Sequence, residues 1–287
     1  MGFIPFVLQA YSQQIVADTG APTIKIPEGV YGDIQIRLSG TGGSGTVVLN
    51  TDPTLITRLK LKKGSQYLVD ATGTQLRALA RNKNGCIPTV TVATSAYSEL
   101  VVPVYFGRYA RDKSGLFIAG QNCQIELTYG TLIATTAFAT GTVCITVFGS
   151  QWVGALPPEY KGAMGCMEVE DKATGTLRAI WDLHTGRKTF GFLIEVVTIT
   201  TVRQVRIQNS DSKPVLAESE WRDILNSDNY EQNKETAETT LAVWKFYNEV
   251  GALEELLDLS ILRNPQLVME RGATTTVTCM NQLDLFT

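Results

Sequence analysis

The chain has 287 residues, enough for two ordinary domains, and its 44% hydrophobic and 18% charged residues are typical of a globular protein. Its formal net charge of −3 argues against a protein that grips nucleic acid through a basic surface. It does not exclude a container that encloses nucleic acid without touching it. The five cysteines form no C-x-x-C pair, and their odd number favours folding in a reducing compartment over a disulfide framework.

The first residues, Met1 to Leu8, are apolar. One interpretation is a first strand or arm packed on the body of the protein. The other is an arm that rests against a neighbouring subunit or a lipid surface through Phe3, Ile4 and Phe6, since apolar termini rarely stay loose in water. Both interpretations remain open from the sequence.

Residues 9–48 alternate short predicted strands with glycine-rich turns, the strands being 14–16, 23–26 and 33–38. The run Ser39–Gly45 is dense in glycine. A phosphate-binding loop would end in Lys-Ser/Thr and open a helix, whereas a strand-like segment, Thr46–Leu49, follows here. We therefore predict a turn without a phosphate site.

The segment Leu55–Leu79 recurs at Thr201–Leu225. In the first copy we expect Leu55, Thr57, Leu59 and Leu61 on one strand face and Ile56, Arg58, Lys60 and Lys62 on the other. A polar turn and a short helix, Thr74–Leu79, follow. The second copy keeps this order, with its helix at Glu220–Leu225, and the offset is constant at 146 positions (202 − 56, 207 − 61, 225 − 79).

Three more blocks recur in the same order. Leu100–Phe106 and Thr240–Phe246 lie 140 apart, Cys123–Gly130 and Pro265–Gly272 lie 142 apart, and Thr142–Val147 and Thr276–Asn281 lie 134 apart. Drifting offsets require only loop insertions, which surface connections tolerate. We interpret the chain as two versions of one β-rich unit.

The segment Leu156-Pro157-Pro158 marks the boundary, because two prolines stiffen the chain and cannot join a sheet ladder. The predicted domains are therefore 1–153 and 166–287, joined by a linker at 154–165. In the second half we expect strands at 177–183 and 190–199, an exposed loop at Asp223–Thr239 and an amphipathic helix at Glu249–Leu262.

The sequence shows no recognisable set of catalytic residues. His184 is the only histidine, although Asp182 and His184 alternate and could face the same side as an acid–base couple. The usual interpretation of such a pair is structural. A chain of this length without a catalytic set is predicted not to be an enzyme, and no cofactor is implied.

Metal and ligand sites are equally weak. The acidic clusters Glu168/Glu170/Asp171 and Glu254/Glu255/Asp258 lack EF-hand spacing, so bound ions stay unknown. The four tryptophans could stack on sugar or bases, but Trp221 and Trp244 belong to the repeated blocks, which favours core packing. The basic loop Arg108/Arg111/Lys113 carries too little charge for nucleic-acid affinity on its own.

The second half carries a resemblance to a known family. Val202–Ile207, Trp221–Leu225 with Asn229-Tyr230, Leu241–Phe246, Glu255–Asp258 and the terminal 276–286 strand resemble, in order, the double jelly-roll major capsid proteins of membrane-containing phages of the corticovirus and finnlakevirus type. The first half resembles them mainly through Leu55–Leu79 and Asn122–Val147.

The resemblance implies an all-β fold of two tandem eight-stranded jelly rolls with short helical insertions. It also implies a homotrimer whose six rolls form a pseudo-hexameric capsomer of an icosahedral shell over an internal lipid membrane. The implied partners are other copies of the chain, vertex or minor capsid proteins and that membrane, with no specific nucleic acid. The implied location is the virion, after folding in the host cytoplasm.

Two alternatives remain. A two-cupin metal enzyme would need several histidines, and the chain has one. A carbohydrate- or receptor-binding β-sandwich, such as a spike or a lectin, fits the strands and tryptophans, and a glycan array would distinguish it from a coat protein.

Overall fold

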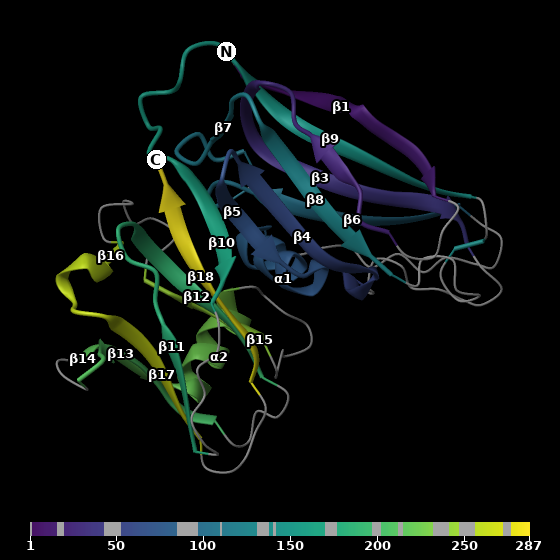
Figure 1. Cartoon of the computed structure of the whole chain (residues 1–287). Helices are drawn as coiled ribbons and strands as arrows, with labels where there is room; N and C mark the ends of the chain where they lie inside the picture. The colour runs from purple at the N-terminus through teal and green to yellow at the C-terminus, as the bar shows by residue number, and fades with distance from the viewer. Residues whose placement is uncertain are drawn as a thin grey trace. The chain divides into compact units, whose positions relative to one another are not determined.

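The computed structural model describes residues 2–15, 20–42, 53–84, 97–109, 111–130, 138–139, 142–169, 177–196, 202–211, 215–231, 241–246, 256–271 and 277–287 (Figure 1). The chain divides into two compact units, Met1–Met164 with Thr287, and Gly165–Phe286. The predicted domain limits and the linker at 154–165 stay a prediction. Across the described residues, no helix combines the length and apolar character needed to cross a membrane.

The first unit contains two layers of antiparallel strands (Figure 1). One layer has the order β1 (Gly2–Ile15), β9 (Val143–Val153), β3 (Gly29–Thr41) and β6 (Tyr97–Tyr105), with β7 (Phe117–Ala119) also paired to β3. The other has the order β5 (Gln66–Ala71), β4 (Ile56–Lys63), β8 (Cys123–Tyr129) and β2 (Thr23–Lys25). The 3-10 helix η2 (Pro53–Leu55) precedes β4, and helix α1 (Gly73–Asn84) follows β5.

The second unit repeats this order. One layer is β10 (Ala163–Glu168), β18 (Val277–Phe286), β12 (Lys188–Val196) and β15 (Leu241–Lys245), with β16 (Leu257–Asp258) also paired to β12. The other is β14 (Val215–Glu220), β13 (Val202–Asn209), β17 (Pro265–Arg271) and β11 (Arg178–Asp182). Helix α2 (Trp221–Glu231) follows β14, and the 3-10 helix η5 (Leu259–Ile261) follows β16.

Each unit is therefore a jelly roll, with eight main strands in the described part of the chain, two four-stranded layers and the same neighbours in both. The predicted fold class is confirmed. The predicted short helices are also confirmed, since 74–79 lies inside α1 and 221–225 inside α2.

The repeat holds at the level of strand register. Leu59 lies opposite Leu127, and Val205 lies opposite Met269, which preserves the predicted offsets (59 + 146 = 205, 127 + 142 = 269). Even a register shift recurs at the predicted 146 positions, between Ile56 and Arg58 in one unit and between Val202 and Gln204 in the other. One physical unit, including its irregularities, occurs twice.

This register shift corrects one prediction. Strict alternation placed Ile56 on the polar face and Thr57 on the apolar one, but Ile56 is buried and Thr57 is exposed. A β-bulge adds a residue to one strand and so exchanges the two faces on one side of it. Alternation resumes with Leu59 and Leu61, both buried.

Two predictions in the second unit are wrong over the described residues. The predicted loop 223–239 begins as helix, because α2 extends to Glu231 and buries Trp221, Ile224 and Leu225 on one face. The predicted helix 249–262 is instead β16 and η5 from 257 to 261; residues 249–255 lie outside the described residues. Leu259 and Leu262 are buried from this irregular segment, so apolar spacing was satisfied without an α-helix.

The predicted offset of the last repeated block differs by one position from the offset in the structure. Asp33 pairs with Tyr105 and Ser150, and Gly191 pairs with Lys245 and Leu283. Since 245 − 105 is 140, as predicted, the equivalent offset for β9 and β18 is 283 − 150, or 133, instead of 134. The sequence similarity of the block does not reveal a one-residue slip.

Candidate functional site

The predicted acid–base couple does not form as a strand pair. β11 ends at Asp182, so His184 follows the strand and is exposed. The Asp182 Oδ1 accepts a hydrogen bond from Gln266 Nε2 at 2.9 Å. The backbone of His184 is held by Gln282, whose Oε1 accepts from His184 N at 2.8 Å and whose Nε2 donates to His184 O at 2.9 Å. Asp182 therefore has a structural side-chain contact, whereas the hydrogen bonds of His184 to Gln282 are made by its backbone.

The acidic clusters do not assemble a metal site in the described ranges, where no group of three or more His, Cys, Asp or Glu side chains converges. Of their members, Glu170, Asp171, Glu254 and Glu255 lie outside the described residues. Asp258 caps η5, because its Oδ1 accepts from Ser260 Oγ at 2.6 Å and from Ser260 N at 2.9 Å. These hydrogen bonds hold the pKa of the Asp258 carboxyl below its ordinary value.

The tryptophans serve the cores, as the sequence predicts for Trp221. Trp181 and Trp221 are 0% and 1% exposed and belong to the apolar core of the second unit, against which Trp244 also packs. Trp152 is 6% exposed in the first unit. An indole this deeply buried offers no face on which a sugar or base could stack.

A buried polar cluster occupies the second unit where β12 and β18 pair. Asp284 Oδ1 accepts from Thr189 Oγ1 at 2.7 Å and from Gln282 Nε2 at 2.9 Å. Burial raises the pKa of the Asp284 carboxyl, and the hydrogen bonds from Thr189 and Gln282 and the charges of His184 and Arg187 oppose that shift. Asp284 Oδ2 has no hydrogen-bond partner in the described part of the chain. The cluster is closed to solvent, so it is a structural element rather than a binding site.

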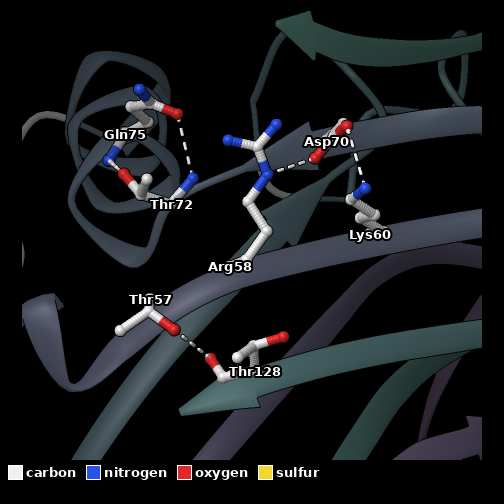
Figure 2. A network of polar contacts seen from close by, with 7 residues as sticks. All are labelled: Thr57, Arg58, Lys60, Asp70, Thr72, Gln75 and Thr128. Atoms are coloured by element: carbon white, nitrogen blue, oxygen red, sulfur yellow. Dashed lines mark hydrogen bonds and ion pairs between the residues drawn. The ribbon is translucent and has the colours of Figure 1, made fainter. Parts of the chain in front are cut away.

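A second polar network lies on the outer face of β4 in the first unit (Figure 2). Asp70 bridges Arg58 and Lys60, with Nε of Arg58 on Oδ1 and Nζ of Lys60 3.7 Å from Oδ2. Thr57 Oγ1 donates to the carbonyl of Thr128 at 3.1 Å. Each of these charges is partly exposed and compensated, which is typical of a solvated sheet face.

The start of α1 completes this region (Figure 2). Gln75 N donates to Thr72 Oγ1 at 3.3 Å, and Thr72 N donates to Gln75 Oε1 at 2.9 Å. This reciprocal capping box satisfies two backbone donors and fixes the start of the helix.

The third region is the end of β9 in the first unit, and it brings together sequence-distant residues. Trp152 packs edge-on against Phe3, with ring centroids 5.2 Å apart, and its Nε1 donates to the carbonyl of Ala155 at 2.9 Å. Lys113 Nζ lies 5.9 Å from the centre of the Trp152 ring. The nearby loop is fixed by Asp112, which is 2% exposed.

Asp112 receives four hydrogen bonds. Its Oδ1 accepts from Ser114 N and Oγ at 2.9 and 2.7 Å, and its Oδ2 accepts from Arg108 N and Nε, both at 3.0 Å. Burial alone would raise the pKa of Asp112, but these hydrogen bonds outweigh it and hold the pKa below its ordinary value. The sequence indicates the basic loop but not its central carboxylate, because an acid among arginines and lysines is typical of ordinary surface charge.

The structure places the predicted arm and linker residues in this same unit. Phe3, Ile4 and Phe6 lie in β1, where they pair with Trp152, Gln151 and Gly149 of β9. Leu156, Pro157 and Pro158 follow β9 without belonging to a strand; Leu156 is 43% exposed and Pro157 is buried. The role of the arm as a membrane- or neighbour-facing element stays a prediction.

Comparison with known proteins identifies the fold. No protein-family profile matches the chain, and no curated protein matches it. Among solved structures it is similar to the major capsid protein of Sulfolobus turreted icosahedral virus, with a TM-score of 0.66, 14% identity, and coverage of 99% of this chain and 96% of the other.

It is also similar to the major capsid protein P2 of bacteriophage PM2, with a TM-score of 0.64, 13% identity, and coverage of 99% and 98%. A third similar structure belongs to the capsid of the virus PBCV-1, with a TM-score of 0.58, 11% identity, and coverage of 99% and 93%. The chain therefore has, along nearly its whole length, the double jelly-roll fold of viral major capsid proteins.

Proposed function

We propose that this chain is a viral major capsid protein whose homotrimers form the pseudo-hexameric capsomers of an icosahedral shell over an internal lipid membrane. The observation that carries the proposal is the pair of jelly rolls with identical strand order, in a fold shared from end to end with known capsid proteins. Three chains with two such rolls each provide six similar lobes, which tile a hexagonal lattice while the assembly needs only threefold symmetry.

The two rolls differ in the helical elements outside their central strands. The register of the central strands is preserved, but α2 (11 residues) differs in sequence and length from α1 (12 residues), and η5 follows β16 where no 3-10 helix follows β7 in the described residues. Similar cores with different surfaces let one capsomer make different contacts with different neighbours. In this proposal the partners are further copies of the chain, vertex or minor capsid proteins and the membrane, and the protein folds in the host cytoplasm before it enters the virion.

The carbohydrate-binding alternative loses its main support. It was based on the β-sandwich and the tryptophans, and Trp181 and Trp221 are fully buried. The proposed role is structural and not enzymatic, like that of the capsid proteins whose fold the chain shares.

The test is the mass of the purified protein in solution, followed by electron microscopy. We expect a species of three times 31.4 kDa that appears as a six-lobed particle and that assembles into curved or closed lattices. A glycan array probed with the same sample is the control. A monomer that binds a glycan and never forms trimers would contradict the proposal.

A further inference from the structure

Exposed apolar side chains gather where β9 ends. Seven large hydrophobic side chains are exposed among the described residues; Val153 (48%) and Leu156 (43%) lie at the end of β9, and Tyr109 (49%) lies in the loop whose Lys113 and Ser114 contact this region. Single exposed apolar residues need no explanation, but three within one turn and its neighbouring loop do.

The same surface is locally basic. Arg111, Lys113 and Lys161 are exposed, whereas Glu159 is the one exposed acid in residues 107–109, 111–115 and 152–162. The acid of this loop, Asp112, is buried and its charge is matched by Arg108. Three exposed cations against one anion give a local excess of two positive charges, on a chain whose net charge is −3.

Specific contacts hold the loop and the turn together as one surface. The Trp152 indole joins them, because its Nε1 binds the carbonyl of Ala155 while its ring lies beneath the Lys113 ammonium group. Lys161 N donates to the carbonyl of Ser114 at 2.8 Å, so the chain beyond the turn is anchored to the same loop. Figure 1 shows the start of β1 beside the end of β9, consistent with the pairing of Gly2 with Val153.

We infer that this surface binds an anionic lipid bilayer peripherally. We define the β9-end surface as Tyr109, Arg111, Lys113, Val153, Leu156 and Lys161. The inference deepens the proposed function and rests on it, because the proposed shell encloses a membrane. The β9-end surface does not include Phe3, Ile4 and Phe6, whose predicted contact with a membrane or a neighbour stays a separate prediction.

The mixture of side chains favours a bilayer over other partners. The ends of aromatic and aliphatic side chains enter the headgroup region of a bilayer, while lysine and arginine side chains attract anionic headgroups. The three exposed cations of this surface have one exposed acid among them, so its partner must supply negative charge, as the headgroups of an anionic bilayer do. A nucleic acid would need more phosphate contacts than three cations can make for useful affinity at physiological salt.

The test uses the purified full-length protein and sedimentation with lipid vesicles. We expect binding to vesicles that contain phosphatidylglycerol, weak binding to pure phosphatidylcholine, and loss of binding at high salt. Arg111→Gln combined with Lys113→Gln should weaken binding about 25-fold, from roughly fivefold for each cation near the surface. Leu156→Ser should weaken it further without changing the salt dependence.

Matched controls come from the second unit. Arg203→Gln with Arg222→Gln removes two exposed cations, and Leu177→Ser removes an exposed leucine; both should leave vesicle binding unchanged. Equal binding by the Arg111/Lys113 variant and the Arg203/Arg222 variant would overturn the inference.

The oligomeric state of each sample separates this inference from the proposed function. A trimer that assembles but ignores vesicles overturns the lipid contact alone, whereas a monomer overturns the capsid role. Loss of trimers, instead of vesicle binding, in the Arg111/Lys113 variant would assign the surface to subunit contact. Duplex DNA that binds in place of vesicles, and is sensitive to the same variant, would assign it to the genome.

Discussion

Thr189 Oγ1 donates a hydrogen bond to Asp284 Oδ1 at 2.7 Å, and neither residue is exposed to solvent. A carboxylate in this position is desolvated, and burial raises its pKa in the folded state. A raised folded-state pKa means that the protonated form contributes stability below the unfolded pKa. That contribution is lost as the pH rises through the folded-state pKa.

Asp284→Asn should therefore flatten the dependence of stability on pH. Asparagine keeps an oxygen for Thr189 and Gln282 but cannot ionise, so the variant should exceed the wild type in free energy of unfolding at pH 8, by on the order of 1 kcal/mol. Near pH 4 the two should converge. Urea unfolding across that range measures both. Asp258→Asn is the control, because a carboxyl with a lowered pKa gives the opposite slope; parallel curves for Asp284→Asn and wild type would contradict the prediction.

Gly115→Ala should destabilise the first unit. A Cβ at Gly115 would overlap Gly107 Cα and the carbonyl oxygen of Phe106, both of them backbone atoms that cannot rotate away. Overpacking of this kind costs about 1–3 kcal/mol. Gly120→Ala is the matched control, since nothing lies within 4 Å of a Cβ there. Thermal unfolding should show a lower Tm for the first variant only, and equal Tm values would show that the loop can move aside.

Arg77→Met should stabilise the protein. Arg77 is 5% exposed in α1, and none of its three guanidinium nitrogens has a hydrogen-bond partner in the described part of the chain. Burial and the nearby charge of Arg81 lower its pKa. Removing an uncompensated buried charge while keeping the apolar stem should add about 1–3 kcal/mol to the free energy of unfolding.

Arg81→Met provides the comparison, because Arg81 is only partly buried and its charge is hydrated. Urea unfolding should show a clear gain for Arg77→Met and little change for Arg81→Met. A large loss of stability in Arg77→Met would mean that an anion compensates Arg77 in solution.

The repeated architecture could be predicted from the sequence for two reasons. Apolar and polar residues alternate within each strand, and the spacing between the two copies of a strand is constant. Val205 and Ile207 are buried as predicted, and their offset from Leu59 and Leu61 is the same as the offset between the two register shifts. Alternation failed at Ile56 and Thr57 and at the equivalent Val202 and Arg203, where a bulge changes which face a residue occupies. No residue type in that strand announces the bulge.

The burial of polar residues on a central strand could not be predicted from strand alternation. From Met280 to Phe286 every side chain of β18 is buried, including Asn281, Gln282 and Asp284. An alternating pattern predicts that one face of the strand is exposed to solvent. β18, however, lies between β12 and β10 and is buried on both faces. The β9-end surface was missed for a related reason: Lys113 and Trp152 meet only through the fold.

Asp112→Ala should release the basic loop. Two donors from Arg108 and two from Ser114 lose their acceptor, and breaking a buried charge pair in this way costs about 2–4 kcal/mol. The lowered pKa of Asp112 means that its contribution is present above the unfolded pKa and is lost as the pH falls through the folded-state pKa. As the pH falls through the folded-state pKa of Asp112, the free energy of unfolding of the wild type should decrease. The variant lacks this carboxyl and should not show that decrease.

Two comparisons make the Asp112 prediction specific. Glu159→Gln removes an exposed acid of the same unit and should change the free energy of unfolding little. Because Asp112 fixes the loop that carries Arg111 and Lys113, Asp112→Ala should also weaken vesicle binding, even though it removes a negative charge near an anionic membrane. Stronger vesicle binding by this variant would mean that net charge, and not the fixed geometry of the loop, governs the contact.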